Sequence, residues 1–316
     1  MAAALALAGC STLIEAPFDA KDPVVGNWGL KLGYDFMNAG HMIVSRDADG
    51  KAQALVLWRW ASPTPMKDVV VEGNEFTFNH PWGYVVKGRV DGCTLTATAY
   101  KKDKPEEVET TVSGWRNPPV CPCASTKNAK FGEPIDLLKD GLDGWKSMDE
   151  KAKFGWSFKD GVLSNTLGLK PDGSWAGGGA NLMSKRADFY DFNLEYDVRV
   201  PTKSNSGVYL RGRYECQVLD SFGKPVNEHN MAAYYGRVVP LVAAEKPAGE
   251  WQHVNVTLYK RHLTVVLNGQ TIIDDAPVVG ITGGAIDANE FARGPIYLQG
   301  DHSDADFKNM ILRPAI

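Results

Sequence analysis

The stretch Phe192-Asn-Leu-Glu-Tyr-Asp-Val-Arg-Val200 alternates apolar and polar side chains along its whole length. Because successive side chains of a β-strand point to opposite faces, this alternation predicts a strand with one buried face and one polar face. Runs 254–258 and 263–267 repeat the pattern, and the second run ends at Asn268-Gly269. Asn-Gly between apolar runs indicates a hairpin turn. We therefore expect two antiparallel sheets packed face to face in this half of the chain.

Length and composition set wider limits. The chain has 316 residues, which corresponds to about two domains. Its net charge of −4 speaks against a basic nucleic-acid surface, so no nucleic-acid partner is expected. The 32 Gly and 18 Pro separate many short apolar runs, a pattern typical of an all-β protein.

The first ten residues end in Leu7-Ala-Gly-Cys10, which resembles a bacterial lipobox. In such signals the Cys thiol is acylated, so we expect Cys10 to carry a lipid and residues 1–23 to serve as lipoprotein signal and tether. This interpretation places the protein in the bacterial cell envelope. There it would be anchored to the membrane and face the periplasm.

Three further segments follow from the pattern. Residues 24–115 contain short apolar runs separated by Asp-Gly and Gly-Asn turns, which predict a small antiparallel β-barrel-like domain of unknown role. Residues 116–130 are rich in Pro and small polar side chains and are expected to be a linker. Residues 131–316 are expected to form the β-sandwich. Trp58 and Trp60 would share one face of a strand, as core residues or, less favoured, as a platform for stacking on sugars.

Four cysteines remain after Cys10, and export would permit disulfides. Pairing of Cys93 with Cys121 or Cys123 would tie the linker to the first domain, although the spacing allows other pairings. Cys216 lies in an apolar strand pattern and is expected to be a small buried side chain.

Three predicted strands, at 207–211, 214–219 and 295–299, alternate in the same way. If they are neighbours, one sheet face carries six polar or aromatic side chains: Tyr209, Arg211, Glu215, Gln217, Tyr297 and Gln299. Such a set suits a saccharide groove, in which rings stack on sugars and planar polar groups bind hydroxyls. An ordinary solvated face with an Arg211–Glu215 ion pair is the alternative, and the pattern alone slightly favours it.

Several motifs in the second half resemble the 3-keto-disaccharide hydrolase family in order and type. The resemblance covers about residues 131–316 and is carried by these segments: Leu138-Lys-Asp-Gly-Leu-Asp-Gly-Trp145, Trp156-Ser-Phe-Lys-Asp-Gly-Val-Leu163, Asn205-Ser-Gly-Val-Tyr-Leu-Arg211, Tyr214-Glu-Cys-Gln-Val-Leu-Asp220, Lys246-Pro-Ala-Gly-Glu-Trp251 and Gly294-Pro-Ile-Tyr-Leu-Gln-Gly-Asp-His302. It implies a concanavalin A-like sandwich, or jelly roll. It covers neither the first domain nor the linker.

The resemblance also implies a chemistry, namely cleavage of 3-keto-glycosides or 3-keto-disaccharides. The keto group acidifies the C2 proton, so deprotonation, elimination of the C1 substituent and hydration give net hydrolysis; direct hydrolysis is the alternative route. The carboxylate pair of ordinary glycosidases is absent from this strand, because Gln217 stands two residues after Glu215. A non-catalytic carbohydrate-binding envelope lipoprotein is the second hypothesis, and a structural envelope protein the third. The chain has no Gly-rich nucleotide fingerprint, so a separate sugar 3-dehydrogenase is the expected functional partner.

Candidate residues follow from type and position. The catalytic candidates are His302 and Glu215 as acid or base, with Arg211 and Lys246 as partners of the developing oxyanion. The substrate-binding candidates are Asn205, Tyr209, Gln217, Asp220, Tyr235 and Gln299; Asn205 and Tyr235 are included because they match family positions. No cofactor is firmly predicted. A divalent metal ion held by Glu215, Asp220 and His302 is left open, and its identity is unknown.

Overall fold

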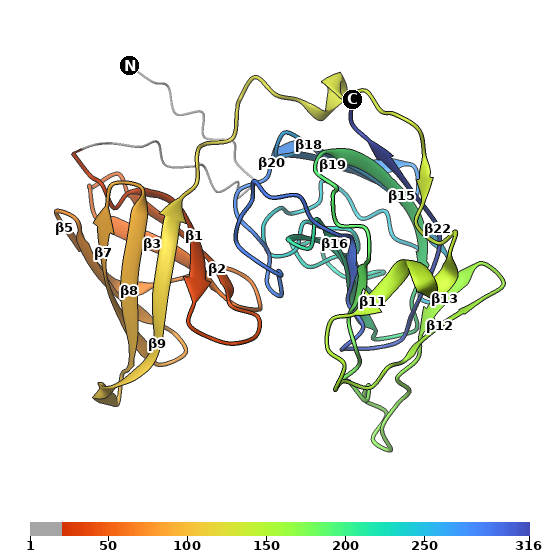
Figure 1. The fold of residues 1–316 in the computed structure, drawn as a ribbon, viewed down its shortest axis with the longest axis horizontal. Helices are drawn as coiled ribbons and strands as arrows, with labels where there is room; N and C mark the ends of the chain where they lie inside the picture. The colour runs from red at the N-terminus through yellow and green to blue at the C-terminus, as the bar shows by residue number, and fades with distance from the viewer. Residues whose placement is uncertain (1–20) are drawn as a thin grey trace.

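The computed structural model describes residues 21–316, which form two groups of β-strands (Figure 1). There are two hydrophobic cores, and the core of the second group also includes Ala39 and Leu57 of the first. The first group is a nine-stranded antiparallel sheet in the order β4-β3-β2-β1-β9-β8-β7-β6-β5. Its strands are β1 (Gly26–Leu32), β2 (Ala39–Arg46), β3 (Ala52–Trp58), β4 (Thr64–Pro65), β5 (Lys67–Glu72), β6 (Glu75–His80), β7 (Tyr84–Asp91), β8 (Thr94–Lys101) and β9 (Lys104–Arg116).

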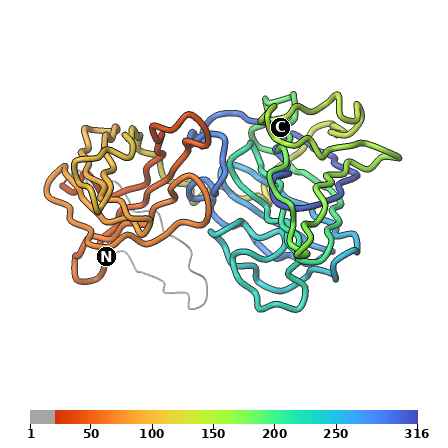
Figure 2. Tube along the Cα trace, turned by 90° about the horizontal axis from the view of Figure 1, so that it is seen from below, coloured from red at the N-terminus to blue at the C-terminus, as the bar shows by residue number. Residues whose placement is uncertain are grey.

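This sheet curls into a nearly closed barrel, as the sequence predicts. The strands at its two ends, β4 and β5, are separated in the chain by Met66 alone, so the two edges are drawn together. Alternate side chains fill the interior, among them the fully buried Trp28 and Leu30 of β1. Figure 2 shows the curled sheet beside the second group of strands.

The second group consists of two further sheets. The larger has the order β12-β13-β22-β15-β18-β19-β20, with β10 paired to β22; the smaller has the order β11-β14-β21-β16-β17. The strands of the larger sheet are β10 (Ile135–Asp136), β12 (Trp156–Lys159), β13 (Val162–Asn165), β15 (Phe192–Arg199), β18 (Gln252–Tyr259), β19 (His262–Leu267), β20 (Gln270–Pro277) and β22 (Ala305–Pro314). Those of the smaller sheet are β11 (Trp145–Ser147), β14 (Leu182–Ser184), β16 (Asn205–Leu210), β17 (Tyr214–Leu219) and β21 (Tyr297–Leu298). Two short 3-10 helices complete the elements, η1 (Thr126–Asn128) and η2 (Gly141–Gly144).

One hydrophobic core lies between these two sheets and contains side chains from both, such as Leu194 of β15 and Val208 of β16. The alternating stretch that begins at Phe192 is β15, which pairs with β18 on one side and β22 on the other. The expected hairpin is confirmed, because Asn268 and Gly269 connect β19 to β20 with φ of 50° and 83°. The architecture is therefore an all-β sandwich of the jelly-roll type.

The segment between the two groups lies along the second one (Figure 1). Thr126 donates from its backbone N–H to Asp275 at 2.7 Å, and Arg261 donates to the carbonyl of Pro118 at 2.7 Å. Asn117 is buried. Residues 116–130 are thus fastened to the sandwich over much of their length.

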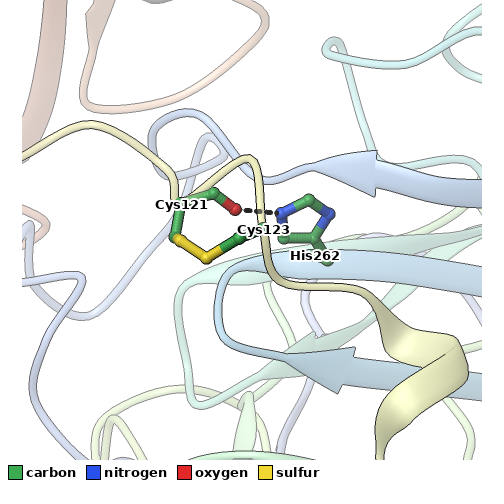
Figure 3. The surroundings of a disulfide bond; sticks show 3 residues. All are labelled: Cys121, Cys123 and His262. Atoms are coloured by element: carbon green, nitrogen blue, oxygen red, sulfur yellow. Dashed lines mark hydrogen bonds between the residues drawn. A yellow bond between two sulfur atoms is a disulfide. The ribbon is translucent and has the colours of Figure 1, made fainter.

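The disulfide in this segment joins Cys121 to Cys123 (Figure 3). The expected pairing with Cys93 is wrong, since Cys93 is an exposed free thiol. The Cys121 carbonyl accepts a hydrogen bond from His262 at 3.0 Å, so the disulfide loop is attached to β19 rather than to the first sheet. Cys216 is buried in the sandwich core, as predicted.

The predicted lipidation site Cys10 lies outside the described residues. Within residues 21–316, none of the helices has the length and apolar character needed to span a membrane.

Candidate functional site

Three neighbouring strands of the smaller sheet align polar and aromatic side chains in two rows. In the first row Tyr209 of β16 pairs with Glu215 of β17 on one side and with Tyr297 of β21 on the other. In the second row Gly207 pairs with Gln217 and accepts a hydrogen bond on its carbonyl from the backbone N–H of Gln299. The alternation of each strand thus places all of these residues on the face turned away from the core.

Gly207 explains why Glu215 can lie within this face. A Cβ at position 207 would lie 2.3 Å from Glu215 Oε1, so the glycine provides the space that the carboxyl group occupies. The tyrosine rings of the first row stack on each other, with centroids 4.1 Å apart and planes 12° from parallel. The face is therefore densely packed rather than solvated, and the alternative of an ordinary solvated sheet face is wrong.

A pocket of about 380 Å³ opens over the two rows. Eight of the residues expected from the sequence line it: Asn205, Tyr209, Glu215, Gln217, Tyr235, Tyr297, Gln299 and His302. The remaining lining residues are Met37, Trp60, Ala61, Gly283, Gly284 and Asp301. The pocket thus combines residues of the sandwich with residues from two loops of the first, barrel-like group of strands.

Glu215 is the buried acid of the pocket. The pKa of its carboxyl is raised from 4.5 to about 8, mainly by burial and to a smaller extent by the nearby Asp301, while a hydrogen bond with Tyr209 acts in the opposite direction. Its backbone N–H donates to Thr282 Oγ1 at 3.0 Å, which fixes the start of β17 against the 282–284 loop. A carboxyl with a pKa near neutrality can exchange a proton with a substrate in either direction.

His302 provides a second titratable group at the same pocket, and its side chain is 49% exposed. Its Nδ1 lies 2.5 Å from Asp301 Oδ1, and this hydrogen bond raises the pKa of the imidazole above 6.5 against the opposing effect of burial. The raised pKa favours the imidazolium form, so the pair offers a proton donor in the same pocket as the buried carboxyl. Asp301 was not identified from the sequence, although it directly precedes His302.

The remaining polar groups of the pocket can bind hydroxyls. Within the described residues, Asn205 Oδ1 and Gln299 Oε1 are buried side-chain oxygens without a hydrogen-bond partner in the protein. Such acceptors are costly unless a ligand or water donates to them. Burial raises the pKa of Tyr209 and Tyr297 well above 10, so both hydroxyls remain protonated.

The structure does not bring Arg211 to the pocket, contrary to the sequence prediction. β16 ends at Leu210, and Arg211 has φ of +54°, so the alternation on which the prediction relied does not extend to it. Its buried guanidinium donates to the Tyr214 hydroxyl at 2.9 Å and lies over the Tyr190 ring. That hydroxyl donates in turn to the buried Glu290.

Lys246 and Asp220 also lie outside the pocket lining. Lys246 is exposed, and its ammonium donates to the carbonyl of Trp251 at 3.1 Å. Asp220 accepts a hydrogen bond from the backbone N–H of Lys203 at 2.8 Å. The ligand set Glu215, Asp220 and His302 is therefore not assembled, and residues 21–316 contain no cluster of three His, Cys, Asp or Glu side chains arranged to hold a metal ion.

Sequence reasoning missed the contribution of the first sheet. Trp58 is buried in the barrel core, as favoured, but Trp60 is 45% exposed and lines the pocket. β3 ends at Trp58 and Arg59 has φ of +77°, so Trp60 does not share the face of Trp58. Nothing in the local pattern indicates this contact, because it depends on how the two groups of strands meet.

Comparison with known proteins gives a family match over most of the second half. Residues 134–313 match the 3-keto-alpha-glucoside-1,2-lyase-like domain family. Three solved structures from Parabacteroides distasonis, each described as a "putative glycosyl hydrolase", resemble the chain. Their identities are 25%, 21% and 18%, and their TM-scores are 0.44, 0.43 and 0.45. They cover 58%, 58% and 57% of this chain and 84%, 100% and 93% of their own. No curated protein matches the chain.

Proposed function

The chain belongs to the 3-keto-alpha-glucoside-1,2-lyase-like family, and from this premise we propose that it cleaves 3-keto-glycosides by deprotonation at C2. The observation that carries the proposal is the buried carboxyl of Glu215 in the same pocket as the His302–Asp301 pair. Family membership supports action on carbohydrates, and these two titratable groups supply the acid and the base that an elimination needs.

Glu215 acts as the base. A proton next to a ketone is weakly acidic, and a carboxylate whose conjugate acid has a pKa of about 8 is a stronger base than an ordinary carboxylate. Loss of the C2 proton gives an enediolate, with charge on the C3 oxygen. The protonated hydroxyl of Tyr297 is the donor proposed for that oxygen, in the place that the sequence analysis assigned to Arg211 and Lys246, whereas the Tyr209 hydroxyl already donates to the Gly283 carbonyl at 2.8 Å.

His302 acts as the acid. Its imidazolium, held by Asp301, protonates the oxygen that leaves C1 as the C1–O bond breaks. Water then adds its oxygen to C1 and a proton to C2, so that the overall reaction is hydrolysis. Asn205 Oδ1 and Gln299 Oε1 accept hydrogen bonds from sugar hydroxyls, which would satisfy both oxygens.

The proposal is tested by incubating the purified protein with a 3-keto-disaccharide and with the unoxidised parent sugar, each with and without a chelator. We expect turnover of the keto sugar only. Glu215→Gln and His302→Ala should each lower kcat by roughly 10²- to 10⁴-fold. Equal cleavage of both sugars, or full activity in both variants, would refute the mechanism. Binding of sugars without turnover would replace it by a carbohydrate-binding role.

A further inference from the structure

The barrel-like sheet contributes a loop to the pocket. Directly after β3 the chain turns through Arg59, Trp60 and Ala61, and the last two line the pocket together with Met37. These residues lie outside the region 134–313 that matches the family. The pocket therefore has one wall that belongs to this chain's additional sheet.

The Trp60 side chain is held by Arg59 and remains partly exposed. The Arg59 guanidinium lies between two aromatic rings, 4.0 Å from the Tyr34 centroid and 4.2 Å from that of Trp60. It also donates to the carbonyls of Phe36 at 2.7 Å and Met37 at 2.9 Å. The guanidinium lies over one face of the indole, and the Trp60 side chain is nevertheless 45% exposed.

The loop is also fastened to the sandwich. The backbone N–H of Gly284 donates to the carbonyl of Arg59 at 2.8 Å. A Cβ on Gly283 would lie 2.5 Å from the carbonyl oxygen of Ala61, and one on Gly284 would lie 2.9 Å from the Tyr209 hydroxyl. Because neither glycine has a side chain, the 283–284 backbone fits closely between the Trp60 loop and Tyr209.

Residues of this loop and its neighbour at Met37 have a strained backbone. Met37, Arg59 and Ala61 all have positive φ, at 47°, 77° and 63°, although none is glycine. Such conformations are unfavourable and persist where the surrounding structure holds them, often at binding sites. Next to them Ser62 Oγ lies 2.7 Å from His229 Nε2 of the sandwich.

We propose that Trp60 forms a second subsite, which binds the group attached to C1 of the reacting sugar by stacking on a ring with an apolar face. This inference rests on the proposed function, which places the keto sugar against Glu215 and His302. Trp60 offers no acid or base, so its contribution is binding, and a partly exposed indole suits the C–H face of a pyranose or an aryl ring. The barrel-like sheet would then select substrates whose leaving group is a ring.

The test compares Trp60→Ala and Trp60→Phe with the control Trp82→Ala. Trp82 is an exposed tryptophan of the same sheet, 42% exposed and not among the residues that line the pocket. Each variant is assayed with a 3-keto-disaccharide, 3-keto phenyl glucoside and 3-keto methyl glucoside. For Trp60→Ala we expect the rise in KM for the two ring-bearing substrates to exceed that for the methyl glucoside by roughly 3- to 10-fold. Trp60→Phe should recover most of the difference.

Whichever ring suffers the larger penalty identifies the preferred leaving group. Equal penalties for all three substrates, or a similar effect of Trp82→Ala, would overturn the subsite. Calorimetric titration with the unoxidised disaccharide, phenyl glucoside and methyl glucoside measures binding without turnover. It therefore distinguishes failure of the subsite from failure of the proposed chemistry. If no keto sugar is cleaved but Trp60→Ala still weakens binding of a ring-bearing glycoside selectively, the proposed chemistry fails and the subsite stands. Unaltered binding would overturn it.

Discussion

Replacing Glu215 by Gln should make the protein more stable at alkaline pH. The carboxyl is fully buried, and its pKa is about 8 in the folded protein against 4.5 for the ordinary side chain. A folded-state pKa above the unfolded one means that the folded state holds its proton more tightly. Stability from this group is therefore complete below pH 4.5 and is lost as the pH rises through 8. Gln has a similar shape and carries no charge, so the variant lacks this loss.

The size of the effect follows from the two pKa values. A difference of about 3.5 pH units corresponds to about 5 kcal/mol, of which about 4 kcal/mol falls between pH 5 and pH 9. At roughly 2–4 °C per kcal/mol for a domain of this size, the melting temperature of the wild type should fall by roughly 10 °C more than that of Glu215→Gln over this interval.

Thermal unfolding followed by circular dichroism at several pH values between 5 and 9 measures this difference. Glu250→Gln is the matched control, because Glu250 is an exposed carboxylate of the same sandwich. A plot of its melting temperature against pH should run parallel to that of the wild type. If the Glu215→Gln curve is also parallel, the carboxyl is not a buried acid with a raised pKa, and the assignment of Glu215 as base loses its physical support.

Other predictions concern single positions. Gly207→Ala should lower kcat by about 10²-fold, because the added Cβ displaces the Glu215 carboxyl; unchanged kinetics would show that the carboxyl is not needed there. Asp301→Asn removes the hydrogen bond that raises the His302 pKa, so less imidazolium should remain at alkaline pH and kcat there should fall, and an unchanged kcat would contradict the role of His302 as acid. Lys246→Ala should leave kcat/KM unchanged, since its ammonium donates to the Trp251 carbonyl away from the pocket. A large loss of kcat/KM would show that Lys246 takes part in the reaction. Cys10→Ala should release the protein from the membrane fraction, and unaltered membrane association would refute lipidation.

Much of the fold is predictable because its strands are long enough to show their period. The stretch from Phe192 alternates without interruption, and it becomes the strand between β18 and β22. The cysteine pairing could not be predicted in the same way. Cys121 and Cys123 are joined to each other, while the carbonyl of Cys121 contacts His262, and such contacts are not encoded in a local pattern.

The alternation predicted site residues that lie within regular strands, and it failed for two residues beyond the strand ends. Tyr209, Glu215 and Gln217 were found because two-residue spacing on a strand determines the face of each side chain. Arg211 was wrongly included because the strand ends one residue earlier, where φ becomes positive. Trp60 was misplaced for a related reason, since its strand ends at Trp58 and its position depends on contact between the two groups of strands.

The most direct test of the account is turnover of a 3-keto-disaccharide in heavy water, with the product examined by NMR. Deprotonation at C2 followed by hydration must deliver a solvent proton to C2, so we predict deuterium at C2 of the released 3-keto sugar. The parent sugar, whose C2 hydrogen is not acidified, should remain intact. A product released without deuterium at C2 would contradict the mechanism, because direct displacement at C1 leaves the C2–H bond untouched.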